Sequence, residues 1–407
     1  MGPLGNSKYS SINTLRFNSF ASCASALYNV VPPNIKSLTT LTTFKPALDV
    51  FLNSFPDTPP TPGYTGQNRN SVLEWADDLS LLNQARDKVK MASRGTIKAS
   101  ANFKAEEDAG TLYKAMKGLG TDEDSILQLL TSRSNAQRQL IKASYKTLHG
   151  KDLIADLKGE LGGTFVTLIV ALMTPPLAYD VEALRNAIKG AGTDESVLVE
   201  ILASRTCQQI KDIVAAYRQE YDDNLEEDIA GDTAGHFKRL LVILLQASRQ
   251  QGVQSNTIEE DAQALFKAGE SKFGTDEQAF VTILGNRSAE HLRKVFDAYM
   301  KLAGYEMEES IKRETSGNLE SLLLAVVRCA RSVPAYFAET LYSSMKGAGT
   351  DDDTLIRVMA TRSEVDMMDI RAHYRRLFSG SLHASINGDT SGDYRKALLL
   401  LCAGDDE

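Results

Sequence analysis

Lys117-Gly-Leu-Gly-Thr-Asp-Glu123 is a short glycine-rich segment that returns along the chain with little change. Two close copies and one altered copy follow it: Lys189-Gly-Ala-Gly-Thr-Asp-Glu195, Lys346-Gly-Ala-Gly-Thr-Asp-Asp352 and Ser271-Lys-Phe-Gly-Thr-Asp-Glu277. Each copy contains a threonine, and the four threonines are separated by 72, 82 and 75 positions: Thr121, Thr193, Thr275 and Thr350. Self-similarity at a nearly constant spacing predicts four structural repeats that share one continuous core.

Two further residue types keep a constant distance from each threonine. An arginine follows 12 positions later: Arg133, Arg205, Arg287 and Arg362. An acidic residue follows 39 positions later: Glu160, Asp232, Glu314 and Asp389. We interpret the arginines as structural residues that tie helix ends or repeats together through carboxylates and carbonyls. Lipid contact by these arginines is the alternative interpretation.

Each repeat is predicted to contain about five helices, which puts the chain in the all-α class. In the first repeat, helix A ends at Lys117, the glycines form a loop, and helix B begins with Thr121 as its N-cap. The expected starts of the other helices are Ser134 or Asn135 for C, Asp152 for D and Thr164 for E. If helix D runs back beside helix B, Glu160 reaches the A–B loop, which would explain the offset of 39.

The A–B loop has the composition of a calcium site. A Gly-x-Gly turn can adopt positive φ, so several backbone carbonyls can converge on one point. Calcium binds carbonyl and carboxylate oxygens. The predicted ligands are the carbonyls of Met116, Gly118 and Gly120 and the side chain of Glu160. A single carboxylate predicts micromolar-to-millimolar affinity, and the unfilled positions can accept a lipid phosphoryl oxygen.

The same residues also fit a glycine C-cap followed by a threonine N-cap, with no metal at all. Spacing alone supports both interpretations equally. The loop is not an EF-hand, which needs alternating Asp and Asn ligands within 12 residues. The alternative function is a helical-repeat scaffold that binds proteins. No metalloprotease, P-loop, hydrolase or dinucleotide-binding motif is present, so we expect no enzymatic activity.

Composition restricts the partners. The net charge is −8, which disfavours nucleic acid and means that a cation is needed to approach an anionic membrane. Apolar stretches fall well short of the roughly 18 residues that span a bilayer. The cysteines show no CxxC pairing, which predicts reduced thiols in a cytoplasmic protein: Cys23, Cys207, Cys329 and Cys402.

Residues 1–95 differ from the rest, being rich in Ser, Thr, Asn and Pro in their first half. We expect an N-terminal extension that is largely disordered. A possible helix spans 71–90, because Ser71 and Glu74 form a capping box ahead of apolar residues. This helix either packs loosely on the core or docks into a groove of a protein partner.

The repeated loops, with their downstream acids and arginines, resemble those of the annexin family. The likeness covers about residues 96–407 and all four repeats in order. It implies a curved disc of five-helix repeats at 96–175, 176–248, 249–332 and 333–407, with calcium loops on the convex face. It also implies calcium-dependent binding to phosphatidylserine-rich membranes by a cytoplasmic protein that associates with them peripherally when calcium rises. Trimers on membranes, anticoagulant and phospholipase-inhibiting behaviour would rest on the likeness alone.

The resemblance assigns calcium ligands by position in the four repeats: Met116, Gly118, Gly120 and Glu160; Ile188, Gly190, Gly192 and Asp232; Lys272, Gly274 and Glu314; Met345, Gly347, Gly349 and Asp389. Thr121 and Glu123 match a secondary calcium site. The third repeat departs from the pattern because Lys272 replaces a glycine. Phe273 at its loop tip is expected to enter the lipid interface or, alternatively, to fold back onto the protein.

Overall fold

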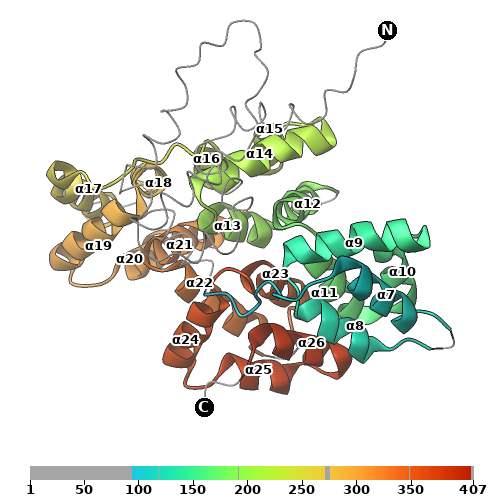
Figure 1. Ribbon diagram of the computed structural model, residues 1–407. Helices are drawn as coiled ribbons and strands as arrows, with labels where there is room; N and C mark the ends of the chain where they lie inside the picture. The colour runs from blue at the N-terminus through green and yellow to red at the C-terminus, as the bar shows by residue number, and fades with distance from the viewer. Residues whose placement is uncertain (1–93, 119, 191, 271–275, 348, 405–407) are drawn as a thin grey trace, which may run out of the picture. The chain divides into compact units, whose positions relative to one another are not determined.

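The computed structural model describes residues 94–404 except 119, 191, 271–275 and 348 (Figure 1). Within these residues the secondary structure consists of twenty α-helices and one short 3-10 helix. The all-α prediction is therefore confirmed. The helix expected at 71–90, with nearly all of the N-terminal extension, lies outside the described residues.

Every repeat holds five α-helices in the same order. In repeat 1 they are α7 (Ala105–Ala115), α8 (Glu123–Thr131), α9 (Asn135–His149), α10 (Leu153–Glu160) and α11 (Gly163–Met173). In repeat 2 they are α12 (Pro176–Ile188), α13 (Glu195–Ser204), α14 (Cys207–Tyr221), α15 (Leu225–Asp232) and α16 (Gly235–Leu245). Repeat 3 begins with the 3-10 helix η2 (Ser255–Thr257), followed by α17 (Ile258–Glu270), α18 (Glu277–Asn286), α19 (Ala289–Ala303), α20 (Met307–Glu314) and α21 (Gly317–Arg331). In repeat 4 they are α22 (Val333–Ser344), α23 (Asp352–Arg362), α24 (Met367–Phe378), α25 (Leu382–Asp389) and α26 (Gly392–Cys402).

The helix starts follow local capping chemistry. Ser134 forms a capping box with Gln137 at the start of α9, and the Asp152 side chain accepts the Ala155 N–H at the start of α10. These are the predicted starts of helices C and D. Helix E begins at Gly163, one residue before the expected position.

The prediction that Thr121 caps helix B is wrong. Asp122 is the N-cap, because its carboxylate accepts the backbone N–H of Ser125 at 3.0 Å. Hydrogen bonds from Ser125 also hold the pKa of Asp122 below its usual value. The aspartate after the threonine caps the second helix in the other repeats as well: Asp194, Asp276 and Asp351.

The recurring arginines are structural, as predicted. In repeats 1 to 3 each makes a bidentate ion pair with an aspartate of the repeat's first helix: Arg133–Asp108, Arg205–Asp180 and Arg287–Asp261. In repeat 4 the position of that aspartate is taken by Phe337. Arg362 there lies 4.6 Å from the centre of the Phe337 ring and pairs with Asp366 instead.

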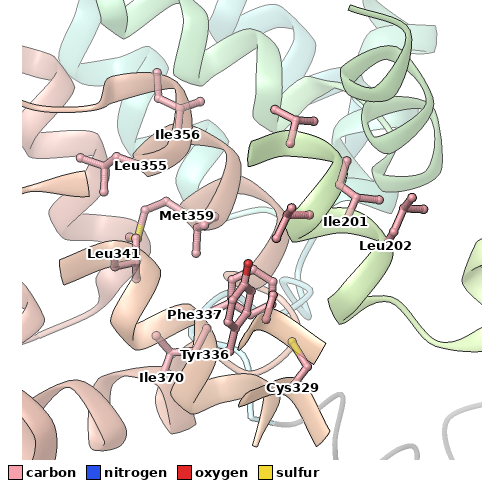
Figure 2. Packing of buried hydrophobic residues seen from close by; sticks show 14 of the residues in the cluster. Ile201, Leu202, Cys329, Tyr336, Phe337, Leu341, Leu355, Ile356, Met359 and Ile370 are labelled. Atoms are coloured by element: carbon pink, nitrogen blue, oxygen red, sulfur yellow. The ribbon is translucent and has the colours of Figure 1, made fainter. Parts of the chain in front are cut away.

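One cluster of buried apolar residues runs through all four repeats. Figure 2 shows part of it, with Ile201 of repeat 2, Cys329 of repeat 3 and Tyr336 of repeat 4. A buried ion pair between Glu200 and Arg357, at 2.9 and 3.0 Å, joins repeats 2 and 4 within this core. The repeats therefore share one interior.

Contacts between helices associate the repeats in two pairs. Helices α8 and α11 of repeat 1 pack against α26 and α23 of repeat 4, and α13 and α16 of repeat 2 pack against α21 and α18 of repeat 3. The segment before α7 also contacts repeat 4, since the Ile97 N–H donates to the Ser363 carbonyl at 3.0 Å. None of the described helices is long and apolar enough to cross a bilayer.

Cys207 and Cys329 are free thiols. Burial raises the pKa of the Cys329 thiol to about 12, so this group stays protonated at neutral pH. A protonated, buried thiol is a poor nucleophile and a poor metal ligand. Cys23 lies outside the described residues.

Candidate calcium-binding loops

The loop between the first and second helices of each repeat is closed by one backbone hydrogen bond. The residue after the threonine donates its N–H to a carbonyl at the end of the first helix. In repeats 1, 2 and 4 the bond joins residues seven positions apart: Asp122 to Ala115, Asp194 to Ala187 and Asp351 to Ser344, at 2.7–2.9 Å. In repeat 3 it joins Asp276 to Ala268 at 2.9 Å, eight positions apart, so that loop encloses one more residue.

The glycines of three loops adopt backbone conformations that other residues rarely reach. The φ angles are +122° at Gly118 and +88° at Gly120, and the glycines of repeats 2 and 4 have φ between +101° and +116°: Gly190, Gly192, Gly347 and Gly349. No atom lies within 4 Å of the place where a Cβ would stand on any of them. The backbone conformation, and not crowding, therefore requires glycine here.

The residue before each Lys-Gly-x-Gly segment anchors the loop in the core. The side chains of Met116, Ile188 and Met345 are buried, each residue being 8% exposed. These residues can therefore reach a metal ion only through their backbone carbonyls. The residues between the two glycines, at positions 119, 191 and 348, lie outside the described residues.

The distant acids of repeats 1 and 4 lie directly beside their loops. The hydroxyl of Thr121 donates to Oε2 of Glu160 at 2.7 Å, and the hydroxyl of Thr350 donates to Oδ2 of Asp389 at 2.6 Å. The offset of 39 residues thus brings the acid to the residue that follows the second glycine, as the sequence predicted.

Repeats 2 and 3 differ from this arrangement. Thr193 donates to the backbone carbonyl of Asp232 at 3.4 Å, and no bond to its carboxylate is present. In repeat 3, Glu314 lies near the end of α17, with its Cγ 3.2 Å from where a Cβ on Gly269 would be. Lys272, Gly274, Phe273 and Thr275 lie outside the described residues.

The donor atoms fit calcium better than a softer metal. Among the described residues, no three His, Cys, Asp or Glu side chains gather as a side-chain metal centre would require. The loops offer backbone carbonyls and one carboxylate each, which are hard oxygen donors. Glu123, assigned to a secondary site, lines a shallow hollow together with Glu160 and residues at the start of α26.

The aspartates that pair with the arginines were not identified from the sequence. They stand 13 positions before the threonine in repeats 1 and 2, at Asp108 and Asp180, and 14 positions before it in repeat 3, at Asp261. That extra position agrees with the longer loop of repeat 3. The nearly constant distance between these aspartates and the loop threonines could have identified them from the sequence. Repeat 4 breaks this pattern, because Phe337 stands at the corresponding position.

A sequence profile of the annexin family matches residues 107–172, 179–244, 260–326 and 336–401. The chain is an annexin. Annexin A5 of chicken (Gallus gallus) is 62% identical over 317 residues, which cover 77% of this annexin and 99% of the relative. The structure of chicken annexin V superposes with a TM-score of 0.74, covering 76% of this chain and 99% of that chain. A calcium-bound annexin (Sm)1 is 33% identical with a TM-score of 0.67, covering 77% and 94%.

Family membership decides the broad function. As an annexin similar to annexin A5, the protein binds calcium and, in its presence, acidic phospholipid. It is not an enzyme, and its membrane association is peripheral. The expectations of four annexin repeats and of calcium as the bound ion are confirmed.

Proposed function

We propose that the loops of repeats 1, 2 and 4 each bind one calcium ion through three backbone carbonyls and one distant carboxylate. The ligands would be Met116, Gly118, Gly120 and Glu160; Ile188, Gly190, Gly192 and Asp232; Met345, Gly347, Gly349 and Asp389. The observation that carries this proposal is the 2.7 Å hydrogen bond between Thr121 and Glu160, which holds the acid at the end of the glycine turn. Positive φ at both glycines is the second support.

Calcium in such a loop is incompletely coordinated by protein, because four protein ligands leave two or more of its usual six to eight positions open. Phosphoryl oxygens of a phosphatidylserine-rich membrane would fill them. Residues 1–93 carry eight basic and six acidic side chains, so residues 94–407 have a net charge of −10. Without calcium this charge repels anionic lipid. With calcium, several weak sites act together, and avidity can exceed single-site affinity by about 10²–10⁴.

The third repeat is proposed to bind more weakly, through the carbonyls of Lys272 and Gly274 and the carboxylate of Glu314. Its loop is one residue longer than the others, so a different spacing of carbonyls is expected. Phe273 would insert into the lipid interface next to the ion. Thr121 and Glu123 would form a secondary calcium site in repeat 1.

The finer biological expectations follow from the same activity. The protein would reside in the cytoplasm and join membranes when calcium rises, with trimers forming on the lipid surface. The helix predicted at 71–90 would recruit a protein partner, and lipid shielding would give anticoagulant and phospholipase-inhibiting effects. The four repeats would span residues 96–175, 176–248, 249–332 and 333–407.

Co-sedimentation with phosphatidylserine-containing vesicles over a calcium series tests the ligand assignment. We expect E160Q and D389N each to raise the calcium concentration needed for half-binding, because each removes the only charged ligand of its loop. E107Q is the matched control, since Glu107 is an exposed residue of α7 paired with Lys104. If the calcium dependence of vesicle binding is the same in E160Q, D389N and wild type, these acids are not calcium ligands. If the protein co-sediments with vesicles in excess chelator, calcium does not bridge the protein to the lipid.

A further inference from the structure

The loop threonines of repeats 1, 2 and 4 do not all make the same contact. In repeats 1 and 4 its hydroxyl donates to the carboxylate of the distant acid, at 2.7 and 2.6 Å. The two acids differ by one methylene, being Glu160 and Asp389, and both still reach the hydroxyl. Thr350 also donates to the main-chain carbonyl of Asp389, at 3.3 Å. In repeat 2, Thr193 makes only this main-chain contact, with Asp232 at 3.4 Å, and lacks the bond to the carboxylate.

These hydroxyls are not needed for the helices that follow them. Asp122 and Asp351 cap α8 and α23 with their own carboxylates, which accept backbone N–H groups at 3.0 and 3.1 Å. A threonine used as an N-cap would instead accept from the backbone. The threonine side chains of repeats 1 and 4 are therefore committed to the acids.

A hydroxyl bonded to one carboxylate oxygen leaves the second oxygen available to an ion. An ionised carboxylate has about four acceptor positions, and the threonine fills one of them. The bond orients a side chain that would otherwise sample several rotamers at the protein surface. An ion that binds a pre-oriented ligand avoids part of the ordering cost.

We propose that Thr121 and Thr350 are positioning residues that hold Glu160 and Asp389 ready for calcium, so that the loops of repeats 1 and 4 fill at lower calcium than that of repeat 2. This inference rests on the ligand assignment proposed above. Repeats 1 and 4 are also neighbours, joined through α8 and α26. Their two ions would thus form the first membrane contact, and repeat 2 would add to it as calcium rises further.

The test compares valine variants in the full-length protein, because valine keeps the branched shape of threonine without its hydroxyl. On phosphatidylserine-containing vesicles, T121V/T350V is expected to raise the calcium concentration for half-binding about three- to tenfold, the range for losing one hydrogen bond in each of the two loops. T193V is the matched control and is expected to change it less than about twofold, because its hydroxyl contacts no carboxylate. T121S/T350S keeps both hydroxyls and is expected to behave as wild type. Wild-type behaviour of T121V/T350V, or an equal loss in T193V, would overturn the proposal.

A double-variant comparison separates this inference from the ligand assignment. If Thr121 acts through Glu160, T121V/E160Q requires the same calcium as E160Q alone. A further loss in T121V/E160Q would mean that the threonine acts independently, which contradicts the positioning role. If E160Q itself has no effect, the ligand assignment fails whatever T121V does. Urea unfolding without calcium checks the fold. If the valine variants prove unstable, T121S/T350S provides the test. A wild-type calcium requirement in T121S/T350S would support the role of the hydroxyls, and a requirement raised as much as in T121V/T350V would contradict it.

Discussion

The recurring arginines and the recurring acids are equally regular in the sequence, yet Arg205 of repeat 2 and Glu160 of repeat 1 lie in opposite surroundings. The Arg205 side chain is 3% exposed and pairs with Asp180, which is 9% exposed, deep between two helices. Glu160 is exposed at the mouth of a loop and its contact is a single hydroxyl. Recurrence therefore marks both kinds of residue, and only burial and partners separate those that hold the fold from those that serve a site.

Repeat 4 strengthens this contrast. Its interior differs from that of repeats 1 to 3, because Phe337 stands where those repeats have the arginine-binding aspartate, and Asp366 provides the carboxylate for Arg362. Its loop has kept both glycines, the threonine and the distant acid. The buried pair can be rebuilt with a partner from another position as long as the arginine charge is satisfied. As the proposed calcium ligand, the loop acid has no such substitute, because the geometry of the loop fixes where its carboxylate must arrive.

The largest expected effect comes from breaking a buried pair. Arg205→Ala leaves the Asp180 carboxylate buried without its partner, which should lower the free energy of unfolding by about 3–5 kcal/mol. Urea denaturation without calcium measures it. Arg133→Ala should cost less, because the Arg133 side chain is 21% exposed and water can replace part of its contact. Equal losses in the two variants would show that burial does not set the strength of these pairs.

The next effect belongs to the loop acids and appears only with calcium. A ligand that binds the folded state alone stabilises it, by about 2.7 kcal/mol at a hundred times its dissociation constant. We expect E160Q/D389N to unfold like wild type in chelator and to gain less stability from calcium. The same denaturation series, run with and without calcium, gives both quantities. If E160Q/D389N is less stable than wild type in chelator, these acids stabilise the fold, as the recurring arginines do.

The sequence predicted the helix order, the loop and the arrival of Glu160 beside the A–B loop, because each follows from periodicity or from a constant offset. It predicted the wrong one of two adjacent residues, Thr121 instead of Asp122, as the cap of helix B. Thr121 and Asp122 are both good N-caps, and the aspartate caps the second helix in all four repeats, including repeat 2, where the threonine makes no bond to the distant carboxylate. Nor did the sequence predict that Arg362 of repeat 4 pairs with a different carboxylate from the arginines of the other repeats. Asp366 lies only four positions after Arg362, at the start of α24, so the pairing depends on how the chain turns between α23 and α24.

A smaller effect separates glycines that the backbone requires from glycines that it does not. Gly347 has a φ of +116°, so Gly347→Ala should strain the loop, lower stability by about 1 kcal/mol and raise the calcium needed for lipid binding. Gly110 lies within α7 with open space at its Cβ position. Gly110→Ala should therefore stabilise the protein by a similar amount, since alanine favours the helix. Thermal and urea unfolding measure the stability of both variants. A lower stability of Gly110→Ala would contradict the distinction between glycines that the backbone requires and glycines that it does not.

The smallest effect is expected from an ion pair that joins two repeats at the surface. Lys396 of α26 contacts Asp124 of α8 at 2.9 Å, but the two side chains are 53% and 69% exposed. Water and salt screen such a pair, and holding both side chains in place offsets most of the attraction. Lys396→Ala should therefore leave the urea midpoint unchanged, although the contact bridges repeats 1 and 4 as Glu200–Arg357 bridges repeats 2 and 4. A midpoint shift that disappears in high salt would show that exposed contacts also hold the repeats together, and would weaken the division between interior and surface.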